Sequence, residues 1–268
     1  MFKKIVLLLL LNSPLLASSQ WLKFDSRPFR PLGADVNEIK FDYIVLNNNR
    51  VNATMGAHYP VYQYHKDDQK FQMGIFGLGF NRLNYDGFNF DLNSYDAIFG
   101  VYADYRKGAT SFSLRYTHIS THLSEGVLVN GNEDHAVFRY SREHLRFLID
   151  HRFTLGPFIL RPYTGFTWVV AAVSPDELKN RLLIQGQLGA EVYLSSFGFV
   201  QPFVAFDLSA ATEHNYFVNK SLVAGLRFMG DSEASFRLQF QYYKGKDPRG
   251  NFYSKDDEFY GAGIAYYF

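Results

Sequence analysis

The chain has 268 residues, a formal net charge of +1 and no cysteine. A charge so close to neutrality gives no reason to expect nucleic acid or a strongly acidic partner. The absence of cysteine excludes disulfides, thiolate metal sites and a lipid-anchored N-terminal cysteine. The 19 Tyr and 27 Phe fit a membrane β-barrel with aromatic girdles at both interfaces, although composition does not exclude an aromatic-rich soluble β-sandwich.

Residues 1–19 have the three parts of a secretory signal peptide. Lys3 and Lys4 form the positive start, and Ile5–Leu11 forms the apolar core. Ala17–Ser19 is a small-residue cleavage site, so we expect the mature chain to begin near residue 20. The apolar run is too short to span as a helix, and no later segment offers ~20 uninterrupted apolar residues. A chain of this kind that spans a membrane must therefore do so as a closed barrel.

Residues 20–38 contain proline and charge and have no clear period. We interpret them as an N-terminal periplasmic segment, either a plug or a clasp on the barrel. Residues 39–268 are then expected to form the outer-membrane barrel.

Apolar residues alternate with polar ones through most of residues 39–268, which is typical of β-strands. Twelve strands are predicted, at 41–45, 53–61, 70–82, 95–106, 112–120, 144–154, 158–170, 181–194, 200–210, 221–228, 236–242 and 258–268. Pro60 indicates a bulge or a strand end. The two faces cannot be assigned for 70–82 or for 135–143, because apolar residues fall on both sides.

The connections alternate in length. Those at 65–69, 107–109, 156–157, 195–198 and 230–233 are short, whereas 121–134, 174–180 and 245–257 are longer. The stretch 83–92, rich in Asn, Asp and Gly, is predicted to be a loop. Outer-membrane barrels have short periplasmic turns, longer outer loops and an even strand count. The expected fold is therefore all-β, a closed twelve-stranded antiparallel transmembrane β-barrel with both termini in the periplasm.

The last predicted strand has an apolar or aromatic residue at every second position and ends in an aromatic: Tyr260, Ala262, Ile264, Tyr266 and Phe268. This pattern resembles the C-terminal signature by which the insertion machinery recognises outer-membrane proteins of Gram-negative bacteria. The resemblance implies an outer-membrane location, outer-membrane lipids around the barrel, and an interaction with that machinery through Phe268.

Charged residues of both signs lie opposite the apolar faces: Lys40, Asp42, Asp96, Asp104, Arg106, Arg115, Asp150, Arg152, Arg161, Glu191, Asp207, Arg227 and Arg237. A selective ion pore would carry an excess of one sign. Unpaired charges away from water are costly, so we expect these charges to pair and fill the interior. A narrow pore for a neutral or zwitterionic solute stays open as an alternative.

Residues 115–120 combine this barrel pattern with the residue types of acyl transfer. His118 and Ser120 fall on the apolar, lipid-facing side of the predicted strand, ~6.6 Å apart along it. Acyl transfer needs a nucleophile, a base and a third group that orients the base. Asn132 and Glu125, in the following loop, are candidates for the third group, and Asn130 is a weaker one.

The residues around this pair resemble outer-membrane phospholipase A, whose motif is Tyr-Thr-His-Gln-Ser-Asn-Gly. Residues 116–122 match its Tyr, Thr, His and Ser. The resemblance implies a twelve-stranded, calcium-dependent, dimeric lipid hydrolase with His118 as base and Ser120 as nucleophile. Asn132 stands at that family's spacing for the orienting Asn. The chain departs at Ile119 and lacks the Asn-Gly after the serine, which puts the oxyanion arrangement and the calcium site in doubt. No cofactor is expected otherwise, and a homodimer is implied only by this resemblance.

Three other stretches, 28–35, 116–123 and 140–146, are similar to a bacterial family classed as domain of unknown function 1207. That resemblance implies a family and no activity.

Other readings of the same residues stay open. With eight His in the chain, one His-x-Ser pair can arise by chance, and histidine suits the membrane interface because it is amphipathic. His118 and His122 could also belong to a metal site, although no carboxylate pattern accompanies them. The sequence thus leaves three classes of function: a lipid-face acyl hydrolase, a narrow solute channel, and a structural or adhesive barrel.

Overall fold

The computed structural model describes residues 27–123, 140–174, 178, 182–229 and 234–267. The predicted signal peptide and Phe268 lie outside these residues. The described strands are β1 Phe41–Leu46, β2 Arg50–Lys66, β3 Gln69–Asp86, β4 Asn89–Lys107, β5 Thr110–Leu123, β6 Tyr140–His151, β7 Phe153–Leu155, β8 Phe158–Ser174, β9 Leu183–Tyr193, β10 Val200–Ala211, β11 Val218–Met229, β12 Ser235–Lys246 and β13 Asp256–Tyr267.

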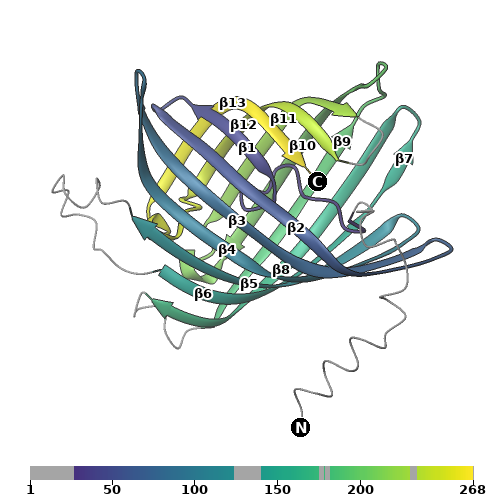
Figure 1. Cartoon of the computed structure of the whole chain (residues 1–268), viewed down its shortest axis with the longest axis horizontal. Helices are drawn as coiled ribbons and strands as arrows, with labels where there is room; N and C mark the ends of the chain where they lie inside the picture. Colours follow the sequence, from purple (N-terminus) through teal and green to yellow (C-terminus); the bar gives the residue numbers. More distant parts are fainter. Residues whose placement is uncertain (1–26, 124–139, 175–177, 179–181, 230–233, 268) are drawn as a thin grey trace, which may run out of the picture.

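These strands form one closed antiparallel barrel (Figure 1). β6 and β7 both pair with β8 and are one barrel strand interrupted at Arg152, so the thirteen segments make twelve strands. β1 pairs with both β2 and β13, and β6 pairs with both β5 and β8, so the ring of described strands has no open edge. The prediction of a closed twelve-stranded antiparallel barrel is confirmed. Closure satisfies every strand's backbone groups without water, which a membrane-spanning sheet requires.

Side chains alternate across the barrel wall as expected. In β12, Phe236, Leu238 and Phe240 face outward, whereas Arg237 and Gln239 are buried inside. An apolar exterior around a polar interior is the pattern of a barrel whose outer face contacts lipid. No helix in the part of the chain that the structure describes is long and apolar enough to cross a membrane.

Two local predictions have different outcomes. Pro60 does mark a bulge, because the β2–β3 register shifts between Pro60 and Tyr62. The predicted loop at 83–92 is wrong: β3 runs to Asp86 and β4 starts at Asn89, so the turn is only Gly87 and Phe88. Gly87 has φ +63°, which glycine adopts without steric cost. Asn and Asp suggested a loop, but the alternating aromatic residues of this stretch keep the two strands paired.

The face of β3 is settled by what lies inside the barrel. Met73 and Ile75 are about half exposed on the outside. Phe76, Leu78 and Phe80 are buried in the lumen, where they cluster with Ile39, Ile98 and Tyr102. The faces could not be assigned from sequence because this barrel has an apolar cluster on its inner wall as well as an apolar exterior.

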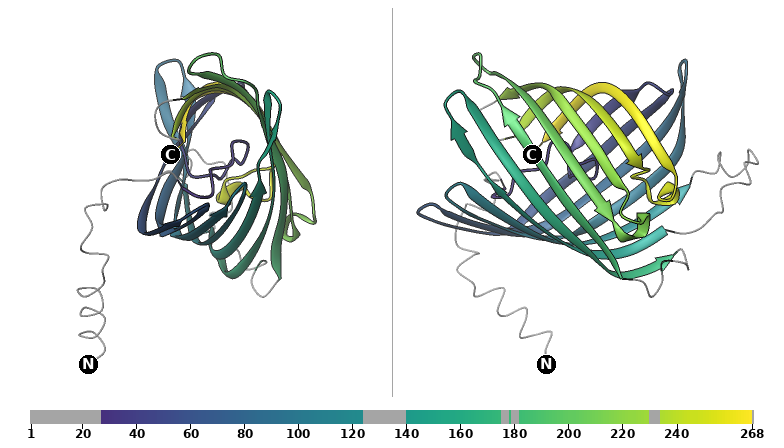
Figure 2. Two further views of the ribbon diagram at one scale, coloured as in Figure 1. Left: turned by 90° about the vertical axis from the view of Figure 1, so that its right-hand side faces the viewer. Right: turned by 180° about the vertical axis from the view of Figure 1, so that it is seen from behind.

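Ile39 belongs to a segment, Arg27–Lys40, that lies inside the ring of strands (Figure 2). We call it the plug. The sequence suggested that residues 20–38 are periplasmic, as a plug or a clasp. Their described part, 27–38, lies inside the barrel, so it takes the form of a plug. Phe29 and Leu32 are fully buried in it and pack against Leu148 and Tyr163 of the barrel wall.

Ion pairs join the plug to neighbouring strands of the barrel wall. Arg27 contacts Asp104 of β4 at 2.8 Å, and Glu38 accepts from Arg115 Nη1 of β5 at 2.8 Å. Burial alone would raise the pKa of Glu38, but Arg115, Arg146 and Arg27 hold it at about 2. The carboxylate is therefore charged at every physiological pH, and it needs its buried partners.

Backbone groups of the plug also form hydrogen bonds with charged side chains of the barrel wall. Arg161 of β8 donates to the carbonyls of Arg30 and Pro31, at 2.6 and 3.1 Å. Gly33 N–H donates to Glu191 of β9 at 2.5 Å. Arg161 also pairs with Glu191 at 2.9 Å and with Asp150 at 2.5 Å, so the predicted pairing of charges inside the barrel is confirmed for these residues.

The connection between β12 and β13 also folds into the lumen. Asp247 accepts two hydrogen bonds from Arg82 of β3, at 2.6 and 2.9 Å. The Arg249 guanidinium lies 4.0 Å from the centre of the Phe80 ring, and Asn251 accepts from Thr121 at 2.9 Å. We call residues 247–255 the inner loop. β1 begins and β13 ends at the opposite rim, where Phe41 pairs with Tyr266. The plug directly precedes β1 and enters from that rim, so the plug and the inner loop fill the lumen from different ends.

Candidate functional site

β5 presents His118 and Ser120 on the outside of the barrel, as its alternation predicts. Ser113, Arg115, Thr117 and Thr121 are buried in the lumen. His118 lies opposite Phe99 of β4 and Glu143 of β6, and Ser120 lies opposite Ser141 of β6. Both residues sit toward the end of β5 that leads to the 124–139 connection, away from the rim where the chain ends.

His118 is held by a carboxylate of the neighbouring strand. Its Nδ1 lies 2.5 Å from Glu143 Oε1, and both side chains are about one quarter exposed. A carboxylate accepts but does not donate, so this contact places the proton of a neutral imidazole on Nδ1 and leaves the Nε2 lone pair free to accept. The Phe99 ring packs at 4.7 Å from the imidazole, which further limits its rotation.

Ser120 has a histidine two residues away on each side along the same face. Its Oγ is 3.2 Å from Nε2 of His122. The structure therefore brings the four side chains together as two pairs, Ser120 with His122 and His118 with Glu143. A serine side chain has three staggered χ1 positions, so Ser120 Oγ is not restricted to the position in which it contacts His122.

The candidates for the third group, Asn132, Glu125 and Asn130, lie outside the described residues and stay predictions. Among the described residues, Glu143, which sequence reasoning did not single out, contacts the Nδ1 side of His118. Its only sequence signal was its place in the family-like stretch 140–146, since opposition to His118 depends on the β5–β6 register.

A metal site at His118 and His122 gains no support from their neighbours. The two imidazoles face different partners, Glu143 and Ser120. Within the described ranges, no group of three or more His, Cys, Asp or Glu residues is placed to hold a metal ion.

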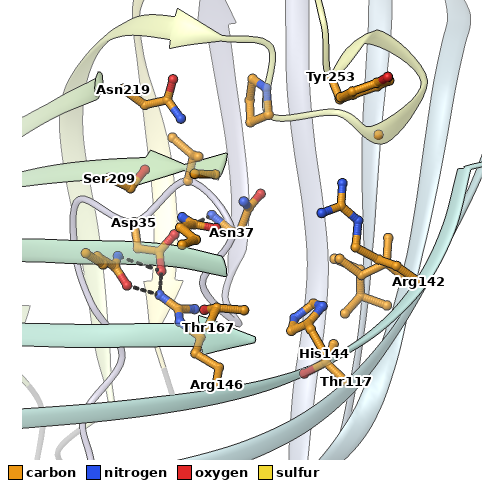
Figure 3. A pocket seen from close by; sticks show the side chains of 18 of the residues that line it. Asp35, Asn37, Thr117, Arg142, His144, Arg146, Thr167, Ser209, Asn219 and Tyr253 are labelled. Atoms are coloured by element: carbon orange, nitrogen blue, oxygen red, sulfur yellow. Dashed lines mark hydrogen bonds and ion pairs between the residues drawn. The ribbon is translucent and has the colours of Figure 1, made fainter. Parts of the chain in front are cut away.

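A second candidate site lies in the lumen. Between the plug and the inner loop is a chamber of about 150 Å³, whose wall carries Asp35, Arg142, His144, Arg146 and Tyr253 (Figure 3). Asp207 also lines it. Arg142 pairs with Glu213 at 2.8 Å, and Arg146 pairs with Asp35 of the plug. Burial would raise the pKa of Glu213, but Arg142 and His214 lower it to about 2.

Comparison with solved structures places the fold among outer-membrane barrels. The β-domain of the Bordetella autotransporter BrkA is similar at a TM-score of 0.50 and 14% identity, over 86% of this chain and 96% of that one. The transport unit of the Escherichia coli autotransporter AIDA-I follows at 0.42 and 13%, over 85% and 87%. OmpT, an outer membrane protein of Vibrio cholerae, gives 0.36 and 10%, over 86% and 95%. The likeness to BrkA shows a shared fold and nothing about activity.

Comparison by sequence gives the family. No curated protein matches the chain significantly. The model of a family described as a protein of unknown function, DUF1207, matches residues 7–268. This agrees with the resemblance of residues 28–35, 116–123 and 140–146, and with the outer-membrane type of barrel that the structure shows. The chain therefore belongs to the DUF1207 family.

Proposed function

We propose that this barrel is a serine acyl hydrolase acting on ester lipids at the membrane-facing side of β5 and β6. Ser120 is the nucleophile, His118 the general base, and Glu143 the group that orients the base. The observation that carries the proposal is the 2.5 Å contact between His118 Nδ1 and Glu143 Oε1 on the strand face that also carries Ser120.

The chemistry follows from the proton positions. With its Nδ1–H donating a hydrogen bond to Glu143, His118 takes the Ser120 hydroxyl proton at Nε2 as Oγ attacks the ester carbonyl. The imidazolium formed is stabilised by the Glu143 carboxylate, and its Nε2 proton passes to the departing alcohol. Water, deprotonated by the same nitrogen, then attacks the acyl-serine carbonyl, and Nε2 returns the proton to Ser120 Oγ as the acyl–oxygen bond breaks and a fatty acid leaves.

The reaction requires Ser120 Oγ to leave His122 and approach His118. Catalytic hydrogen bonds are often long or misaligned without substrate and tighten only in the complex. His122 is a competing base because it already contacts Oγ, but no carboxylate contact to it is found in the part of the chain that the structure describes. The oriented imidazole, His118, is the better base.

The surroundings suit a lipid substrate. Below His118 on the same outer face, Leu114, Tyr116 and Phe147 are all more than 40% exposed, so acyl chains can lie against them. The resemblance of residues 116–122 to outer-membrane phospholipase A supports the same roles for His118 and Ser120. In this proposal Glu143 replaces the Asn132 that the resemblance implied.

The resemblance also implied calcium. Calcium takes six to eight oxygen ligands, whereas the described outer face near Ser120 offers Ser141 and a Glu143 carboxylate already bound to His118. These residues do not fit a calcium site, so no catalytic step is assigned to the metal. Calcium and a chelator remain two arms of the assay.

The test is hydrolysis of phospholipid by the full chain, folded in detergent or lipid. Ser120→Ala should abolish activity, and Glu143→Gln should lower kcat about 10²-fold or more, because a correctly held base is worth about 10²–10⁴ in rate. Ser141→Ala is the matched control, since Ser141 lies opposite Ser120 on the same face and should keep full activity.

Two variants separate the bases. His118→Ala should remove activity and His122→Ala should retain most of it. The reverse result would assign the base to His122 and leave Glu143 without its role. A folded wild-type protein that hydrolyses no ester lipid would overturn the proposal and favour a structural barrel. A Ser120→Ala variant as active as the wild type would overturn the role of Ser120 as the nucleophile.

We further infer export by residues 1–19 and membrane insertion through the C-terminal strand. β13 carries the outward residues Tyr260, Ile264 and Tyr266 of the insertion signature. The N-terminal sequence of the membrane-extracted protein should begin near residue 20. Phe268→Ser should reduce the amount inserted in the outer membrane, and unchanged insertion would count against this role.

A further inference from the structure

The lumenal chamber is closed off from the proposed lipid site by the barrel wall. Its lining comes from the plug, from the inner loop and from the inner faces of several strands. Arg142 and His144 of β6 lie on one side of the open space, and Asp35 and Asn37 of the plug lie on the other (Figure 3). The chamber thus has two chemically different sides.

The first side carries a guanidinium and an imidazole. Arg142 is only 7% exposed, its Nη1 pairs with Glu213, and its Nη2 has no hydrogen-bond acceptor among the described residues. A buried guanidinium nitrogen without an acceptor is costly. His144 stands two residues away on the same inner face of β6 and points into the same space. A bound carboxylate would supply the missing acceptor.

The opposite side has an excess of acid. Asp35 pairs with Arg146, whereas Asp207 accepts hydrogen bonds from two neutral groups, Tyr163 Oη at 2.7 Å and Gln187 Nε2 at 2.6 Å. Gln187 Nε2 also reaches Asp35, at 3.3 Å. Two carboxylates thus meet around a single amide, and a cation placed beside them would relieve their repulsion.

From this arrangement we propose that the chamber is a binding site for a small zwitterion of the amino-acid type. Its carboxylate lies against Arg142 and His144, and its ammonium lies toward Asp207 and Asp35. A cavity of about 150 Å³ is the size that holds one benzene-sized molecule of about six heavy atoms. Glycine and serine are within that range. The site is independent of the lipid hydrolase proposed above.

Calorimetry on the full chain in detergent tests the proposal, with glycine and serine as zwitterions. Acetate and ethylammonium carry only one of the two charges. The zwitterions should bind about tenfold or more tightly than either single-charge compound, because each end contributes a charge-assisted contact. Asp207→Asn should weaken glycine binding about tenfold and leave acetate unchanged.

Arg142→Lys keeps the charge that pairs with Glu213 but lacks the second guanidinium nitrogen, and it should weaken both glycine and acetate. Lys244→Gln is the control, because Lys244 is exposed on the outer face and should not change binding. Equal affinity for acetate and glycine would overturn the two-ended site and leave an anion site. No saturable binding of any probe would show that the chamber holds only water.

Discussion

Glu143 shows that the role of a carboxylate depends on which residue the fold places beside it. A carboxylate facing the membrane boundary is unfavourable unless it is paired, and His118 provides the partner across the β5–β6 ladder. The carboxylate of the plug residue Glu38 is buried inside the barrel, where it is also unfavourable unless it is paired, and the guanidinium of Arg115 is its partner. Both carboxylates are held by a residue from a distant part of the chain.

The Glu38–Arg115 pair should matter far more than an exposed pair. Glu38→Gln leaves the Arg115 charge buried without its partner, and we expect a loss of about 3–5 kcal/mol in stability. Glu258→Gln is the matched control, because Glu258 and Lys244 are both about half exposed and an exposed pair contributes little to stability. Thermal unfolding in detergent measures both, and equal effects would contradict the buried role of Glu38.

Acid should weaken the plug through the same residue. The pKa of Glu38 is about 2 in the folded chain, against 4.5 as its ordinary value. A lowered folded pKa means that the stabilisation is fully present above pH 4.5 and is lost as pH falls toward 2. Limited proteolysis near residues 27–40 should become faster across that window. In Glu38→Gln this acid dependence should shrink, and an unchanged profile would assign it to another group.

At the scale of elements, β3 and β4 show that one hairpin can have very different surroundings along its length. Phe80 of β3 is 1% exposed inside the lumen, whereas Phe88 at the hairpin turn is fully exposed. The first belongs to the apolar cluster around Ile39 of the plug, and the second makes no comparable packing contact among the described residues.

Truncation of these two phenylalanines should therefore change the free energy of unfolding by very different amounts. Phe80→Ala creates a cavity beside the plug and should cost about 3–5 kcal/mol. Phe88→Ala should change stability by less than about 0.5 kcal/mol, as surface changes usually do. Thermal unfolding of both variants checks this. A large loss in Phe88→Ala would indicate that the turn packs against something in the folded protein.

At the scale of the whole molecule, the barrel is closed by its own chain. The plug enters from the rim where β1 begins and β13 ends, and the inner loop folds in from the other rim (Figure 2). The remaining chamber of about 150 Å³ is far smaller than the aqueous channel of a porin. This arrangement favours the filled interior expected from the mixed charges over an open channel.

Conductance in planar bilayers should be limited by both the plug and the inner loop, because each fills one end of the lumen. The wild-type barrel should conduct little, and deletion of residues 27–38 should raise conductance only modestly, because the inner loop still occupies the other end. Combining that deletion with Arg82→Ala, which frees Asp247 of the inner loop, should raise it further. Retained heat-dependent mobility in SDS gels would show that each barrel is folded. High conductance of the wild type would contradict a closed lumen.

The sequence by itself determined the barrel. Alternation, turn lengths and the mixed inward charges were enough for the strand number, the antiparallel closure and the outward face of His118 and Ser120, because each of these properties repeats locally along a strand. Only the tertiary structure decided the position of the plug, the inner face of β3 and the pairing of His118 with Glu143. Those depend on contacts between residues far apart in the chain, such as Glu38 with Arg115, and no local period records which distant strand or segment will lie opposite.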